Sequence, residues 1–351
     1  MRIAQLIPGV RPANDLVGGV LARDLVVAGS RWPKGRRLSP LDLELLMSPD
    51  TVIDARRGLD LRGLTVLIPD ADDVHEDEAA LRLARLVAGD GLSRRGPAES
   101  RVDLLAAVDG VVHVRIGRLE RLNRLDMVDV FTVYDGQTVR IGELVASAKI
   151  APHLVPVAVL ERAAALVGPR GLVDVTPFVA RRVVAIVKES VHPPARQRFE
   201  ASVRLKVEAL GSRLVDIACV DDSTEAVARA LAEASRRADL ILTAGSASTD
   251  PADAFFGAIE RLGGRVVRHG VPAHPGSMLW LARIGRVDIL GLPTCGAYSK
   301  ATAADLILPR LLTGERVSRA LVAGLGHGGV LSHEMRFRFP DYARDLDAPD
   351  G

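Results

Sequence analysis

Short apolar runs alternate with amphipathic stretches along the second half of the chain. The apolar runs are rich in Val, Ile and Leu, are bounded by Gly, Pro or Asp, and lie at 181–187, 214–220, 238–245, 264–271 and 287–293. Strands that are buried on both faces of a parallel sheet have this composition. The pattern therefore predicts five strands of one buried sheet.

Helical spacing fills the intervals between these runs. The predicted helices lie at 196–211, 221–238, 251–264 and 299–315. In the first of them Phe199, Val203 and Val207 fall on one face, as in an amphipathic helix. Strict alternation of strand and helix predicts an α/β fold with a three-layer, doubly wound and mostly parallel sheet. Ligands of such sheets lie beyond the carboxyl ends of the strands.

The first half has a different pattern, which predicts a β-rich α+β region. Residues 64–89 begin as a strand and pass through an acidic loop into an amphipathic helix, and 108–155 carry short apolar runs with an Asp-Gly turn. A short helix is expected after Ser39 and Pro40. We expect three regions, which are 1–180, 181–317 and a C-terminal extension 318–351 that ends in a loose tail at 339–351.

Composition narrows the class of protein. The 351 residues carry 46 basic and 44 acidic side chains, so the net charge of +2 gives no overall field for nucleic acid or anionic membrane. Aromatic residues make up 3%, which argues against a base-stacking surface. Cys219 and Cys295 suggest neither a disulfide framework nor a zinc site. The N-terminus has no apolar signal segment and no run of 18 apolar residues occurs, so we expect a cytoplasmic protein.

The strand at 238–245 ends in a loop of small polar residues and carboxylates. In chain order the loop contains Thr243, Gly245, Ser246, Ala247, Ser248, Asp250 and Asp253. Small residues let a ligand approach the backbone, and free amides at a helix N-terminus bind anions. A plain turn that caps the next helix would also explain this loop. Two more loops, 274–278 and 293–300, follow strands at the same predicted edge, and this favours a ligand site.

These loops resemble those of a known family. Residues 243–253 resemble the Thr-Thr-Gly-Gly-Val-Ser-x-Gly-x-x-Asp loop of the molybdopterin-binding domain, which molybdopterin adenylyltransferases and molybdopterin molybdotransferases share. Residues 264–284 resemble the family's strand and Pro-Gly-Lys-Pro loop, and 289–300 resemble its Leu-Pro-Gly-Asn-Pro loop. The first half, together with GLGHGGVL at 324–331, resembles a molybdotransferase-like subgroup of uncertain activity.

The resemblance implies a protein of molybdenum-cofactor biosynthesis that binds molybdopterin or adenylylated molybdopterin. The implied ligand-binding residues are Thr243, Gly245, Ser246, Ala247, Ser248, Pro275, Gly276, Ser277, Pro293, Cys295, Gly296, Ser299 and Lys300. In an enzyme, Asp253 and Asp250 would act in catalysis and Asp253 would hold Mg²⁺. Alternatively, Asp253 orients a backbone turn or is an ordinary early-helix carboxylate.

The resemblance also implies partners. They are a small pterin ligand, a second copy of the chain in a homo-oligomer, and other molybdenum-cofactor proteins, without nucleic acid or membrane.

Departures from the family pattern separate ligand binding from catalysis. Ser277 replaces the loop lysine, Met278 replaces the proline after it, and 294–296 replace Gly-Asn-Pro. The lost lysine removes charge that would stabilise a transferring group, and Lys300 is either its substitute or a solvated lysine at a helix end. Cys295 is either a soft ligand or a small buried thiol.

We therefore expect ligand binding with weak molybdotransferase activity. The alternatives are a noncatalytic carrier or sensor of the cofactor and an unrelated nucleotide-binding α/β protein.

Overall fold

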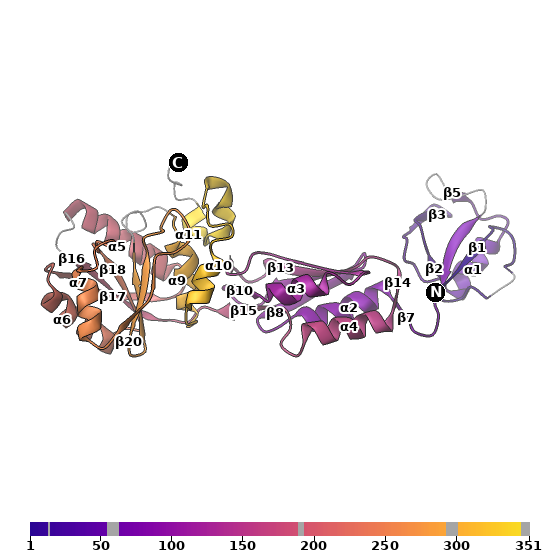
Figure 1. Cartoon of the computed structure of the whole chain (residues 1–351). Helices are drawn as coiled ribbons and strands as arrows, with labels where there is room; N and C mark the ends of the chain where they lie inside the picture. The colour runs from indigo at the N-terminus through magenta and orange to yellow at the C-terminus, as the bar shows by residue number, and fades with distance from the viewer. Residues whose placement is uncertain (13–14, 55–62, 189–192, 293–300, 345–351) are drawn as a thin grey trace. The chain divides into compact units, whose positions relative to one another are not determined.

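The computed structural model describes residues 1–12, 15–54, 63–188, 193–292 and 301–344, and it divides the chain into two compact units (Figure 1). The first unit contains Met1–Ala107, Val114–Val133 and Gly142–Asp174. The second contains Val108–His113, Tyr134–Ile141 and Val175–Gly351. Three segments from within 1–180 thus belong to the second unit, which are 108–113, 134–141 and 175–180. No helix in the described ranges is long and apolar enough to span a bilayer.

The first unit starts with two small sheets, in strand orders β1-β6-β2 and β4-β3-β5. Their elements are β1 (Arg2–Leu6), β2 (Val20–Leu21), β3 (Leu25–Val27), β4 (Ser30–Trp32), α1 (Pro40–Met47), β5 (Ile53–Asp54) and β6 (Leu64–Ile68). Helix α1 starts as predicted, because the Ser39 hydroxyl accepts from the Asp42 amide while the Asp42 carboxylate accepts from the Ser39 amide.

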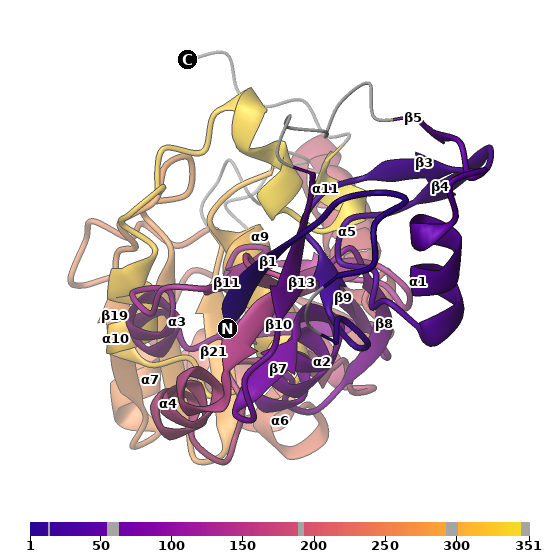
Figure 2. The ribbon, with the colours of Figure 1, turned by 90° about the vertical axis from the view of Figure 1, so that its right-hand side faces the viewer.

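The rest of the first unit is an antiparallel sheet with helices, seen from the side of this unit in Figure 2. The strand order is β11-β13-β9-β8, and α2 packs on three of these strands. The elements are β7 (Asp73–His75), α2 (Glu76–Val87), β8 (Leu92–Ala98), β9 (Arg101–Ala106), α3 (Ile116–Leu122), β11 (Val128–Thr132), β13 (Leu144–Ile150), β14 (Leu154–Pro156) and α4 (Val157–Val167). The β-rich α+β prediction is confirmed here, including the amphipathic helix that buries Ala79, Leu83 and Val87.

The second unit is built around a six-stranded sheet. Its strands are β16 (Arg182–Lys188), β17 (Arg213–Val220), β18 (Leu240–Ala244), β19 (Arg265–His269), β20 (Trp280–Ile284) and β21 (Val287–Gly291). Its helices are α5 (Pro193–Glu208), α6 (Thr224–Arg237), α7 (Ala254–Arg261), α9 (Ala304–Leu312), α10 (Arg319–Gly324), the 3₁₀ helix η1 (His333–Arg338) and α11 (Asp341–Arg344). A smaller sheet of order β12-β10-β15 completes the set, with β10 (Gly110–Val114), β12 (Thr138–Val139) and β15 (Val173–Pro177).

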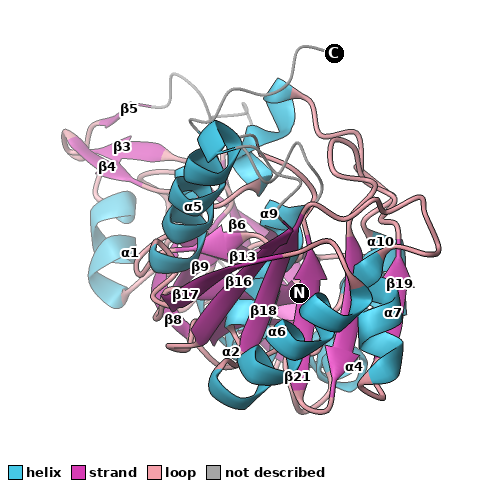
Figure 3. Cartoon of the chain, turned by 90° about the vertical axis from the view of Figure 1, so that its left-hand side faces the viewer, coloured by secondary structure: helices cyan, strands magenta, loops and turns pink. Residues whose placement is uncertain are grey.

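The strand order of the large sheet is β17-β16-β18-β21-β20-β19 (Figure 3). Strands β17, β16, β18 and β21 are parallel, whereas β20 is antiparallel to both of its neighbours. The predicted mostly parallel α/β fold is therefore confirmed. Strand β20 was not predicted, because 264–284 resembles one strand followed by a loop.

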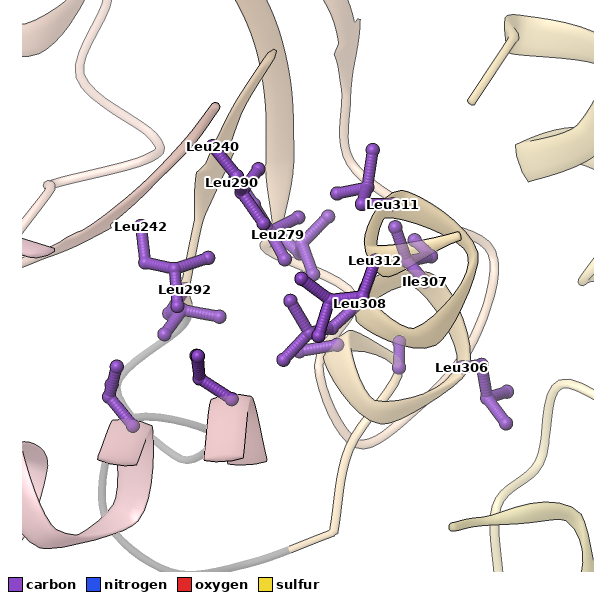
Figure 4. Close-up of a cluster of buried hydrophobic side chains, with 14 of the residues drawn as sticks. Leu240, Leu242, Leu279, Leu290, Leu292, Leu306, Ile307, Leu308, Leu311 and Leu312 are labelled. Carbon is purple, nitrogen blue, oxygen red and sulfur yellow. The ribbon is translucent and has the colours of Figure 1, made fainter. Parts of the chain in front are cut away.

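Helices cover both faces of this sheet and make three layers. Apolar residues of α5 and α9 pack on one face, and those of α6 and α7 pack on the other. In Figure 4, Leu242 of β18 and Leu290 of β21 face the apolar side of α9, which presents Ile307 and Leu311. These buried strands fix where the loops at their carboxyl ends begin.

The C-terminal extension is part of this core rather than a loose tail. Phe339 and Ala343 are buried, and the Tyr342 hydroxyl donates to Asp305 at 3.0 Å. The prediction of a loose tail is therefore wrong for 339–344, because these residues form a turn and a short helix whose apolar side chains are buried in the core. Residues 345–351 lie outside the described residues.

Candidate functional site

The loop after β18 leaves the sheet through a glycine turn. Gly245 has a φ of 86°, a left-handed conformation that residues with a Cβ rarely adopt. After it, Ser246 and Ser248 are partly buried and Ala247 is exposed. The amides of Ser246 and Ser248 donate to no residue that the structure describes. This turn thus presents unpaired donors at the carboxyl end of a buried strand.

Asp253 holds the loop to the start of α7. One carboxylate oxygen accepts from the Phe255 amide at 2.9 Å and caps the helix. The other oxygen accepts from the Ala247 amide at 2.7 Å and from Lys188 Nζ at 2.8 Å. The side chain of Asp253 is only 1% exposed. This geometry fits two of the expected roles of Asp253, which are the orientation of a backbone turn and an early-helix carboxylate.

Lys188 lies at the end of β16 and was not singled out from the sequence. Its Nζ lies 2.8 Å from Asp253 and 2.8 Å from Asp222, and its side chain is 3% exposed. Burial opposes the charge of this lysine, but the hydrogen bonds to Asp222 and Asp253 outweigh it and raise the pKa of Lys188. A lysine that ends an otherwise apolar strand was the available signal, since the chain has only five lysines.

Two aromatic side chains, one on β20 and one on β19, contact the same loop. The Trp280 indole donates to the Ser246 hydroxyl at 3.3 Å, and a His269 ring nitrogen contacts the Ser248 carbonyl. Trp280 lies so close to Gly291 of β21 that a Cβ there would be 2.1 Å from the ring. Buried Trp280 and exposed His269 therefore both hold this loop.

Thr243 leaves one polar atom unpaired beneath this loop. The residue is fully buried on β18, and its Oγ1 has no hydrogen-bond partner in the described ranges. A buried hydroxyl without a partner costs free energy and calls for an explanation such as a bound molecule.

The second loop, 274–278, is packed rather than open. Pro275 and Gly276 are buried, and a Cβ on Gly276 would lie 2.8 Å from the Ala303 amide. That amide donates to the Pro275 carbonyl at 2.9 Å. Ser277 is partly exposed. In this loop, therefore, Pro275 and Gly276 shape the backbone, while Ser277 is left at the surface.

The third loop falls outside the described part of the chain. Its predicted ligand-binding residues are Pro293, Cys295, Gly296, Ser299 and Lys300, and Thr294 lies among them. The helix predicted to start at 299 appears as α9, which begins at Ala304. In its first turn, Asp305 accepts from the Thr302 amide at 2.9 Å and so closes that turn.

Part of this unit matches a known family. Residues 194–313 match the family model described as "Probable molybdopterin binding domain". Residues 194–313 belong to this family. No curated protein sequence gave a significant match to the chain.

Solved structures resemble the chain more weakly. The molybdopterin biosynthesis MoeA protein from Pyrococcus horikosii is 14% identical, with a TM-score of 0.31 over 69% of this chain and 79% of that one. The molybdopterin biosynthesis enzyme MoaB from Thermus thermophilus is 20% identical, with a TM-score of 0.29 over 39% of this chain and 98% of that one. Because both scores lie below 0.5, the description of the fold rests on the strand order.

The molybdopterin-binding domain contains every residue of the predicted site but not all of the residues that support it. Gly245, Ser248 and Asp253 lie within 194–313, whereas Lys188 precedes the matched residues. The charge that holds Asp253 in place is thus supplied from outside the matched segment.

The donor set fits Mg²⁺ poorly. Asp253 already accepts three hydrogen bonds, and Asp250 is exposed and accepts from the Ala252 amide at 2.8 Å. In the part of the chain that is described, no three His, Cys, Asp or Glu side chains are grouped to hold a metal ion. Magnesium binding by Asp253 would require it to release Lys188 and the loop.

Proposed function

We propose that the molybdopterin-binding domain binds molybdopterin, or its adenylylated form, with the phosphate at the loop after β18. The observation that carries this proposal is that the amides of Ser246 and Ser248, just ahead of α7 and inside the matched residues, donate to no residue in the described ranges. Such amides and the helix dipole favour an anion. The unpaired hydroxyl of Thr243 under the loop supports it.

The chain's role in molybdenum-cofactor biosynthesis would then be to bind the pterin, with weak molybdate insertion as one outcome. Carriage of the cofactor without catalysis is the second candidate, and one observation favours it. Ser277 occupies the position where the family places a lysine. Among the described residues, the lysine near the loop after β18 is Lys188, and two carboxylates hold it. A site with so little free positive charge stabilises a transferring group weakly.

Titration calorimetry of the full chain with molybdopterin tests the binding proposal. We expect saturable binding by the wild type and none by Gly245→Val, because the new side chain would enter the anion position and strain the turn. Gly263→Val is the matched control. Its φ is 66° and its Cβ would meet no atom within 4 Å, so it has the same backbone cost away from the site.

Three outcomes bear on the proposal. Absence of binding by the wild type refutes it. Normal binding by Gly245→Val would show that the loop is a structural turn only. Release of AMP from adenylylated molybdopterin after molybdate is added separates the two candidates, since a carrier releases none.

A further inference from the structure

The contacts of Lys188 resemble those of a bound cation. One ammonium group lies 2.8 Å from a carboxylate oxygen of Asp222 and 2.8 Å from one of Asp253. The two acids come from different loops, one before α6 and one before α7, and both lie at the carboxyl edge of the sheet. A divalent ion shared by these two carboxylates would have to occupy the same space.

The surroundings make this cation a permanent part of the fold. Lys188 is 3% exposed, and the ring of Phe255 lies 5.7 Å from its Nζ. Asp253 is buried as well, and an unpaired carboxylate there would be costly. Asp222 differs, because its side chain is 49% exposed and solvent reaches it.

Resting on the proposed function, we propose that Lys188 takes the place of a divalent cation at this edge, so that the site binds its phosphate-bearing ligand without a metal ion. The positive charge comes from the chain itself and holds Asp253, which in turn holds the Ala247 amide. Lys188 is therefore a positioning residue, and the loop amides contact the ligand.

Manganese alone is the first probe, followed by electron paramagnetic resonance of the full chain. The wild type is expected to leave Mn²⁺ free in solution. Lys188→Met opens the space between Asp222 and Asp253 and is expected to gain one Mn²⁺ site. Lys188→Met/Asp253→Asn is the matched control, which removes the lysine and one ligand and should lose that site.

The affinity for molybdopterin is the second readout. With wild type, the Kd measured with EDTA should equal the Kd with Mg²⁺ within about twofold, a difference below about 0.5 kcal/mol. Asp222→Asn should keep this independence, because the exposed partner is dispensable for holding Asp253. If Lys188→Met does not fold, the Kd for molybdopterin of the wild type and of Asp222→Asn, each measured with EDTA and with Mg²⁺, still shows whether the site needs a metal ion.

The results separate the two proposals. A wild-type Mn²⁺ site that Asp253→Asn removes, or molybdopterin binding that EDTA abolishes, would overturn the role of Lys188. If molybdopterin does not bind in either buffer, the proposed function fails, while the Mn²⁺ measurement still tests Lys188 as an occupant of the metal position.

Discussion

Two buried lysines in the second unit make the same kind of contact in different surroundings. Lys188 ends β16 and pairs with Asp253 at the N-terminus of α7. Lys206 lies within α5 and pairs with Asp305 in the first turn of α9. Both aspartates lie at the start of a helix, where each accepts a hydrogen bond from a backbone amide that precedes the helix.

The shared element is an aspartate that accepts a backbone amide. Asp253 accepts from Ala247 at 2.7 Å, and Asp305 accepts from Thr302 at 2.9 Å. A buried carboxylate at a helix start favours the dipole but needs a counter-charge, because desolvation is costly. The chain meets this need twice with a lysine from a neighbouring element.

The difference lies in the second partner of each pair. Lys188 also contacts Asp222, which is half-exposed, whereas Lys206 lies 5.5 Å from the ring of Tyr342. The Tyr342 hydroxyl donates to Asp305, and burial together with that carboxylate raises the tyrosine pKa well above its ordinary value. The Lys188 pair is buried but has half-exposed Asp222 beside it at the ligand edge, and we call it the open pair. The Lys206 pair is covered by the C-terminal helix, and we call it the sealed pair.

The sealed pair should respond most strongly to mutation. Lys206→Met leaves Asp305 charged and unpaired in the core, and we expect a loss of about 3–5 kcal/mol in the free energy of unfolding. Urea denaturation followed by Trp280 fluorescence in a Trp32→Phe background measures the second unit, because Trp280 lies in β20. Lys206→Met/Asp305→Asn should recover part of the loss. A change below about 1 kcal/mol in the single variant would contradict the sealed pair.

The open pair should tolerate the same change better. Lys188→Met is expected to cost about 2–3 kcal/mol, less than Lys206→Met, because solvent reaches half-exposed Asp222 and weakens the repulsion between the two carboxylates that remain. The same fluorescence assay compares the two variants directly. If Lys188→Met proved the more damaging, the edge would be the more tightly packed region and the comparison would reverse.

The pattern of apolar residues predicted the sheet well but not these contacts. Runs such as 181–187 and 214–220 became β16 and β17 because burial on both faces dictates their composition. Lys188 and Asp253 are 65 positions apart, and only the folded register brings them together. Strand β20 was not predicted for a related reason. Its pairing with β19 and β21 appears only in the fold, and 264–284 resembles a single strand followed by a loop.

Tyr342→Phe tests whether the tyrosine hydroxyl stabilises the sealed pair of Lys206 and Asp305. The change removes one hydrogen bond to Asp305 and keeps the ring beside Lys206, so we expect a loss of about 1–2 kcal/mol. Phe255→Leu is the corresponding change at the open pair, where the ring lies 5.7 Å from Lys188. An unchanged unfolding midpoint for Tyr342→Phe would mean that the C-terminal helix covers the core without holding Asp305.

A third pair, in the first unit, uses histidine in place of lysine and should give the smallest effect. His153 Nδ1 lies 3.0 Å from Glu76 Oε1, and this hydrogen bond raises the pKa of His153 against the opposing effect of burial. A raised pKa means that the pair stabilises the fold fully below the ordinary histidine value of about 6.5, and that this contribution is lost as the pH rises through the folded pKa. The Lys188 pair should show no such loss near neutrality, because its two carboxylates raise the pKa of Lys188 above an ordinary value that already lies well above neutrality. Denaturation followed by Trp32 fluorescence in a Trp280→Phe background, from about pH 5.5 to about pH 8.5, should show stability of the first unit that declines with pH. His153→Gln should flatten that decline, and an equal decline in the variant would show that other groups cause it.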